Sequence, residues 1–73
     1  MRIERADVVL ANLTGAVLVR YARELRSLLA DDGYLVLSGF APSDVAVIQT
    51  AFADLATIRI EPEGEWAALL LKS

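Results

Sequence analysis

The chain has 73 residues, of which 56% are hydrophobic, and its formal net charge is −3. This length permits one small domain or part of a larger one, which buries only roughly 60% of the surface of the unfolded chain. The acidic balance argues against nucleic-acid binding. The sequence contains neither cysteine nor histidine, which excludes disulfides, thiolate chemistry and the most common general base and metal ligand.

The hydrophobic content exceeds the roughly 45–50% that is typical of soluble domains. In so short a chain, this excess predicts that part of the apolar surface faces another layer of protein, either a second copy or a missing part of the same fold. No segment approaches the roughly 20 apolar residues of a membrane helix, and no signal-peptide cleavage pattern follows Arg2 and Arg5. We therefore expect a soluble, cytoplasmic protein with no membrane partner.

The first predicted element is a short apolar strand from Asp7 to Asn12. Its residues do not alternate between polar and apolar, which is typical of a strand covered on both faces of a parallel sheet. Thr14 is then predicted as the N-cap of a helix over residues 15–30. The apolar face of this helix comprises Val17, Leu18, Tyr21, Ala22, Leu25, Leu28 and Leu29. The solvated face carries Arg20, Arg23, Glu24, Arg26 and Ser27.

The sequence Asp31-Asp32-Gly33 is predicted to end this helix, with the glycine in the left-handed conformation. A second buried strand follows from Tyr34 to Ser38. Pro42 then opens a second helix that runs to about Leu55. The inner face of this second helix comprises Val45, Ile48, Phe52 and Leu55.

Two further strands, Thr57 to Glu61 and Trp66 to Lys72, flank a turn at residues 62–65, and so short a link forces an antiparallel hairpin. The order strand, helix, strand, helix, strand, strand predicts an α/β fold. Its first three strands are expected to be parallel through right-handed crossovers, and the last antiparallel. The aromatic residues Tyr34, Phe40, Phe52 and Trp66 are expected in the core or partly in it. The glutamates Glu61, Glu63 and Glu65 are expected to be solvated, so no metal site is predicted.

Asn12 is the first candidate functional residue, because ligands of open parallel sheets bind just beyond the carboxyl ends of the strands. The alternative is that Asn12 caps the following helix or bonds its own turn. Ser38 and Gly39 end the neighbouring strand on the same edge, where they either line a substrate site or form a small-residue turn. No nucleophile–base pair supports hydrolytic catalysis.

Three segments resemble the C-terminal half of class I S-adenosylmethionine-dependent methyltransferases. Residues 7–13 resemble the fourth-strand motif, residues 28–39 resemble the helix, turn and fifth strand, and residues 61–71 resemble the closing hairpin. Together they are most similar to the type that methylates ribosomal protein L11 on amino groups. The resemblance implies that residues 1–73 are a single partial domain, the C-terminal half of a Rossmann-like methyltransferase sheet.

The same resemblance implies roles for individual residues. Asn12 would be the catalytic residue that orients the target nitrogen, and the substrate-binding residues would be Asn12, Leu13, Ser38 and Gly39. Relatives that methylate glutamine or nucleobases carry an Asn-Pro-Pro-aromatic motif. Here Leu13 and Thr14 follow the asparagine, which favours the ribosomal-protein type.

Members of this family hold S-adenosylmethionine mainly with a glycine-rich loop and an acidic residue on early strands. The four glycines of this chain form no such loop. We therefore expect no cofactor-binding residue and no cofactor for this chain alone, and no catalysis by the isolated chain.

The open edge left by such a partial fold predicts a partner. A flat, apolar edge strand from Asp7 to Asn12 invites pairing, so we expect either a homo-oligomer or a complementing N-terminal half, with a ribosomal protein as substrate. The alternative function is a non-catalytic, self-associating α/β module. A third reading is an unrelated small α/β domain, such as a partner-binding subunit.

Overall fold

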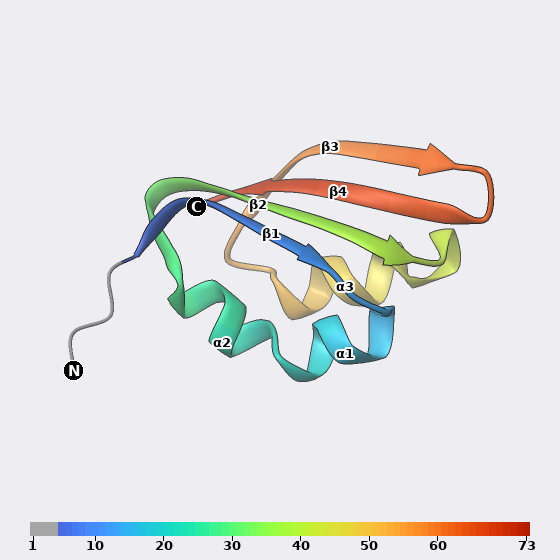
Figure 1. Ribbon diagram of the computed structural model, residues 1–73, viewed down its shortest axis with the longest axis horizontal. Coiled ribbons are helices and arrows are strands. Elements are labelled where there is room, and N and C mark those ends of the chain that lie inside the picture. The colour runs from blue at the N-terminus through green and yellow to red at the C-terminus, as the bar shows by residue number, and fades with distance from the viewer. Residues whose placement is uncertain (1–4) are drawn as a thin grey trace.

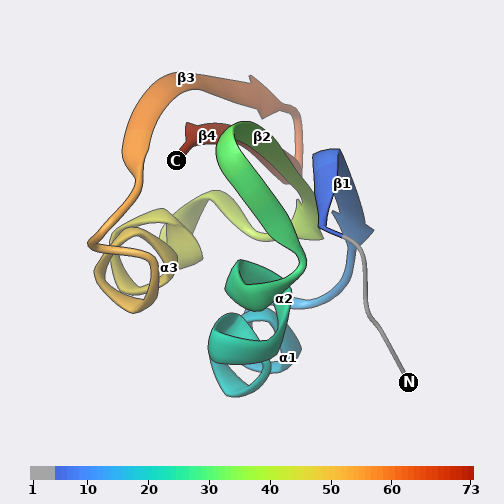
Figure 2. The same ribbon diagram turned by 90° about the vertical axis from the view of Figure 1, so that its left-hand side faces the viewer.

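The computed structural model describes residues 5–73, which form a mixed α/β fold around one four-stranded sheet. In chain order the elements are β1 (Ala6–Asn12), α1 (Gly15–Arg20), α2 (Ala22–Ser27), β2 (Leu29–Phe40), the 3-10 helix η1 (Pro42–Asp44), α3 (Val45–Ala51), β3 (Ala56–Glu63) and β4 (Trp66–Lys72). Figures 1 and 2 show the helices on one face of the sheet, with the opposite face left bare in the described part of the chain.

The sheet has the strand order β1-β2-β4-β3. β1 and β2 are parallel, and β4 is antiparallel to both of its neighbours, β2 and β3. The first three strands therefore share one direction and the last opposes them, as the sequence predicts. β3 and β4 form the predicted hairpin, although its turn is shorter, at Gly64 and Glu65, because β3 continues to Glu63.

The prediction of one helix over residues 15–30 was wrong. Two short helices meet at Tyr21. At the end of α2, the Ser27 hydroxyl donates a hydrogen bond to the backbone carbonyl of Glu24 at 2.6 Å. Leu29 belongs to β2, where it pairs with Ala6 and is 1% exposed. Strand pairing thus prevails over helix propensity, since it buries Leu29 in the sheet.

The predicted inner face of that helix is only partly confirmed. Leu18 and Ala22 are buried, whereas Tyr21 and Leu28 are 44% and 39% exposed because they lie where the helices bend and end.

The left-handed residue near the start of β2 is Asp32 (φ 61°), so the prediction for Gly33 was wrong. A short polar side chain such as that of aspartate tolerates this conformation. Gly33 is needed for space instead, because a Cβ at this position would lie 2.8 Å from the carbonyl oxygen of Ala30.

The second helix is also shorter than predicted. η1 and α3 together span Pro42 to Ala51, and Phe52 and Leu55 lie beyond the helix end. Both nevertheless remain buried with Ile48, and Val45 packs against them, so the predicted inner face is confirmed.

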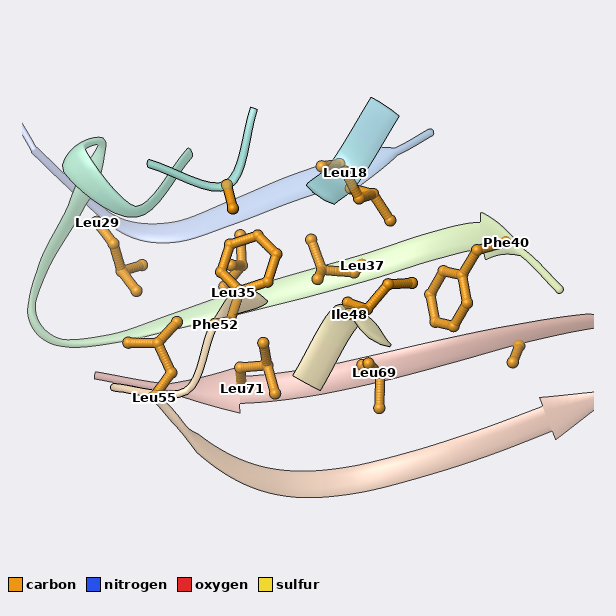
Figure 3. Close-up of a cluster of buried hydrophobic side chains, with 13 residues drawn as sticks. Leu18, Leu29, Leu35, Leu37, Phe40, Ile48, Phe52, Leu55, Leu69 and Leu71 are labelled. Carbon is orange, nitrogen blue, oxygen red and sulfur yellow. The ribbon is translucent and has the colours of Figure 1, made fainter. Parts of the chain in front are cut away.

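The core lies between the helices and the inner face of the sheet (Figure 3). Its buried members are Ala11, Leu18, Ala22, Leu29, Leu35, Leu37, Phe40, Ile48, Phe52, Leu55, Ala67, Leu69 and Leu71. Phe40 and Phe52 confirm the prediction of core aromatics. Tyr34 and Trp66 do not, because their strand positions alternate with buried neighbours and direct them to the bare face.

The prediction that β1 is buried on both faces was also wrong. Val8 is 54% exposed and Leu10 is 75% exposed, because no helix in the described part of the chain covers that face. β1 is an edge strand of the sheet within the described part of the chain, as the resemblance to a partial fold predicts. Among residues 5–73, no helix is long and apolar enough to cross a membrane.

Replacing Ile48 by alanine tests this packing. Ile48 is fully buried between α3 and the sheet, so Ile48→Ala should lower the free energy of unfolding by about 2–5 kcal/mol. A domain of this size has only about 4–11 kcal/mol in total. Urea unfolding followed by far-ultraviolet circular dichroism measures the change. Val47→Ala is the control, because Val47 on the same helix is 52% exposed and should change the stability by no more than about 0.5 kcal/mol. Equal effects of the two variants would contradict the packing of α3.

Candidate functional site

The carboxyl ends of β1 and β2 meet at one edge of the sheet, and β4 begins there (Figure 1). Asn12 is aligned with Ser38, and the backbone N–H of Leu13 donates to the Ser38 carbonyl at 3.0 Å. Ala68 of β4 is the partner of Ser38 on its other side. The three strand ends enclose a depression of about 420 Å³, lined by Asn12, Ser38, Gly39, Trp66, Ala67 and Ala68.

Gly39 shapes this depression. The register between β2 and β4 shifts at this residue, because Ser38 pairs with Ala68 whereas Phe40 pairs with Ala67. Such a bulge turns the end of a strand and redirects the side chains beside it. Gly39 has a φ of 87°, and a Cβ there would overlap the amide oxygen of Asn12. Glycine therefore lets the Asn12 carboxamide lie directly against the backbone of β2.

The Asn12 carboxamide is exposed to solvent. Its side chain makes no hydrogen bond to any residue between 5 and 73. The N-cap of α1 is Thr14, as predicted, although its hydroxyl makes no capping bond. The capping alternative for Asn12 therefore has no hydrogen bond to support it, and the amide is free to bond a ligand.

The structure brings three of the four predicted site residues together. Asn12, Ser38 and Gly39 line the depression. Leu13 does not line it: its backbone N–H bonds the Ser38 carbonyl, and the residue is 37% exposed. Sequence reasoning missed Trp66, which is 57% exposed at the edge of the depression. An antiparallel last strand must begin at the carboxyl edge of the parallel strands, and this was the signal that could have identified it.

None of the residues that line the depression is ionisable. They offer an amide, a hydroxyl, an indole N–H and backbone groups, which are neutral hydrogen-bond donors and acceptors. Glu61 lies farther along the same edge, where it pairs with Arg59. Within the described residues, no group of three or more acidic side chains could hold a metal ion. This arrangement can orient a small polar group, and it contains no nucleophile activated by a base.

The residues present do not fit a nucleoside cofactor by themselves. The link from β1 to α1 is only Leu13 and Thr14, followed by Gly15. A Cβ on Gly15 would lie 2.6 Å from a carboxylate oxygen of Asp44, so this glycine serves close packing between elements. Glycine-rich loops that bind nucleotides place several glycines between a strand and a helix. The described residues contain no such loop.

Comparison with known proteins gives consistent matches. A family model described as Ribosomal protein L11 methyltransferase (PrmA) matches residues 1–73. The ribosomal protein L11 methyltransferase of Geobacter sulfurreducens is 38% identical over 71 residues, which are 94% of this chain and 24% of the relative. The corresponding protein of Geotalea daltonii is 40% identical over 67 residues, 89% of this chain and 21% of the relative.

A crystal structure of ribosomal protein L11 methylase from Lactobacillus delbrueckii subsp. bulgaricus matches with a TM-score of 0.84 and 24% identity. The match covers 93% of this chain and 36% of that chain, and it shows that the folds agree. This chain spans about a quarter of the length of the curated relatives that it matches.

The contact between Asn12 and Gly39 can be tested by a double-mutant cycle. Gly39→Ala should lower the free energy of unfolding by about 1–2 kcal/mol through its left-handed backbone and by a further ~1–3 kcal/mol through overlap with Asn12. Gly64→Ala is the control, because Gly64 also has a positive φ (64°) but has no atom within 4 Å of an added Cβ. Adding Asn12→Ala to Gly39→Ala should recover the overlap cost in urea unfolding. Strictly additive effects would show that the two residues do not touch.

Proposed function

The chain belongs to the ribosomal protein L11 methyltransferase family, and from this premise we propose that it supplies the substrate-orienting end of an amine N-methyltransferase. Its fold matches the C-terminal part of the L11 methylase fold. The observation that carries the proposal is the free carboxamide of Asn12 at the carboxyl edge of β1, held against Gly39. A complementing part that binds the methyl donor would complete the enzyme.

Methylation of an amine requires an unprotonated nitrogen whose lone pair points at the methyl group, so positioning supplies most of the rate. A carboxamide oxygen can accept a hydrogen bond from such a nitrogen and thereby aim its lone pair. The neutrality of the site matters, because a carboxylate at this position would stabilise the ammonium form and raise the pKa of the amine. Asn12 can orient the amine without holding its proton.

The other residues around the depression support the same role. Ser38 lies beside Asn12 in the strand register, and its hydroxyl can donate or accept a second bond. Trp66 presents an exposed aromatic side chain on the opposite side of the depression. An indole ring provides a flat apolar surface for the alkyl chain that carries an amino group. We propose that the substrate is an amino group of a ribosomal protein and that the reaction takes place in the cytoplasm.

A second candidate function is a non-catalytic, self-associating α/β module. The exposure of Val8 and Leu10 on an edge strand favours it. Equilibrium dialysis of this chain with radiolabelled S-adenosylmethionine tests whether the chain acts as an enzyme by itself. Saturable binding would favour an enzyme role for the chain by itself, and no binding would favour a role that needs a complementing part or a module without catalysis.

A chimera tests the role of Asn12. The matched segment of the Geobacter sulfurreducens methyltransferase is replaced by this chain, and methyl incorporation into ribosomal protein L11 is measured. We expect an active chimera whose kcat falls about 10²-fold with Asn12→Ala, since orientation of the amine is lost. Asn12→Asp should also lower kcat and shift the pH profile to higher pH, because the carboxylate raises the pKa of the amine.

Gln49→Ala is the matched control for the chimera. Gln49 carries the same amide group on α3, where it bonds the Thr57 hydroxyl at 3.1 Å, away from the depression. Its loss should leave kcat unchanged. Full activity of the Asn12→Ala chimera would exclude the proposed orienting role.

A further inference from the structure

The contact between Gly39 and Asn12 decides which end of the Asn12 carboxamide faces the candidate site. The Cβ position of residue 39 overlaps the amide oxygen of Asn12 and lies 3.3 Å from the carboxamide carbon. The oxygen is therefore the end that rests on Gly39, and the amide nitrogen, on the far side of that carbon, points away from the glycine. The Cα–H groups of glycine are weak hydrogen-bond donors, so an oxygen is favourable at this contact and an N–H group is not.

This orientation leaves the amide oxygen available to a ligand. A carboxamide oxygen has two lone pairs. One lone pair is taken up by the contact with Gly39, and the other remains for the depression that both residues line. Asn12 is exposed, and its side chain makes no hydrogen bond to residues 5–73. The contact with Gly39 therefore restrains a side chain that no hydrogen bond within the described residues holds.

The backbone at Gly39 is anchored on both sides. The next residue, Phe40, is 1% exposed, so the core holds the strand beside the glycine. The carbonyl of Ser38 accepts a hydrogen bond from the backbone N–H of Leu13 at 3.0 Å, which ties the ends of β1 and β2 together. A methyl group added at residue 39 would therefore displace the exposed carboxamide of Asn12 rather than the backbone.

We propose that Gly39 is a positioning residue for methyl transfer, because it orients the carboxamide of Asn12 and thereby the amine that Asn12 binds. Gly39 needs no contact with the amine for this role. It presets the acceptor before the substrate arrives, so binding of the amine does not have to order that group. This inference rests on the proposed function of Asn12 and adds a second residue on which the orientation of the amine depends.

The alternative is that residue 39 must be glycine for its backbone conformation alone. Gly39 has a φ of 87°, which by itself favours glycine. Gly64 provides the comparison, because it also has a positive φ (64°), whereas its Cβ position has no atom within 4 Å. Alanine at residue 64 therefore tests the backbone requirement alone, and alanine at residue 39 adds the displacement of Asn12.

A kinetic cycle in the chimera with the Geobacter sulfurreducens methyltransferase tests this role. Gly39→Ala should lower kcat, measured per folded enzyme, at least about tenfold, because a displaced acceptor no longer aims the amine. Gly64→Ala should leave kcat unchanged. The KM for S-adenosylmethionine should stay the same in both variants, since the complementing part binds the methyl donor. With Asn12→Ala already present, Gly39→Ala should lower kcat no further, because Gly39 acts only through Asn12.

The outcomes of the cycle separate this inference from the proposed function. An equal loss of kcat on Gly39→Ala with and without Asn12 would overturn the inference, because Gly39 would then act independently of the carboxamide. A loss no greater than that of Gly64→Ala would overturn it as well. An unchanged kcat in Asn12→Ala would instead refute the proposed function, and the inference with it.

Asn12→Gln provides a second variant that leaves Gly39 in place. Glutamine carries the carboxamide on a side chain that is one methylene longer, so its oxygen cannot rest on Gly39 and face the depression in the same way. We expect kcat to fall about as far as in Asn12→Ala. Nearly full activity of Asn12→Gln would show that the carboxamide needs no positioning by Gly39.

Nuclear magnetic resonance of the isolated chain observes the contact without an activity assay. Asn12 is the only asparagine and Gln49 the only glutamine of the sequence, so two side-chain amide groups give signals, and Asn12→Ala identifies that of Asn12. Gly39→Ala should shift this signal and lower its heteronuclear Overhauser effect, which reports order on the picosecond to nanosecond timescale. Gly64→Ala should leave the signal unchanged. An Asn12 signal that Gly39→Ala does not alter would contradict the contact.

Discussion

The pairing of β4 with β2 is the contact on which the rest of the structure depends. It places Leu69 and Leu71 beside Leu35 and Leu37, and these leucines form the floor of the core under the helices. It also carries the start of β4 to the carboxyl edge of the sheet, where the parallel strands end. One strand pairing thus creates both the hydrophobic core and one wall of the candidate site.

The site at this edge depends on a local defect in that pairing. The bulge at Gly39 interrupts the ladder between β2 and β4 and makes room for the amide of Asn12. The resulting depression is neutral, since amide, hydroxyl and indole groups surround it. Neutral groups suit a reaction in which the nucleophile must lose its proton before it reacts, because none of the residues that line the depression is an anion that favours the protonated form.

Much of the fold could be predicted from the sequence because the signals are local. The order of elements, the hairpin and the inner face of the second helix follow from periodicity and turn residues, and Asn12, Ser38 and Gly39 follow from their places at strand ends. The position of β4 between β2 and β3 could not, because it depends on contacts between residues far apart in the chain. The early end of the first helical segment could not be predicted for the same reason, because it depends on the pairing of Leu29 with the distant Ala6 in the sheet.

The face of the sheet that carries no helix in the described part of the chain was misread for a different reason. A strand such as β1 has the same apolar pattern whether its covering layer belongs to the same chain or to another, so the pattern predicted burial that the described residues do not provide. Trp66 was expected in the core or partly in it because aromatic residues in such elements usually pack there. Its position beside the depression depends on which strand β4 joins.

Trp66 also makes the chain its own spectroscopic reporter. It is the only tryptophan of the sequence, so all indole emission comes from the wall of one depression. With more than half of its surface in water, this ring should emit at the long wavelengths of a solvated indole. Any molecule that binds beside the Trp66 ring and excludes water from it, whether small or large, should shift that emission to shorter wavelengths without the need for an added dye.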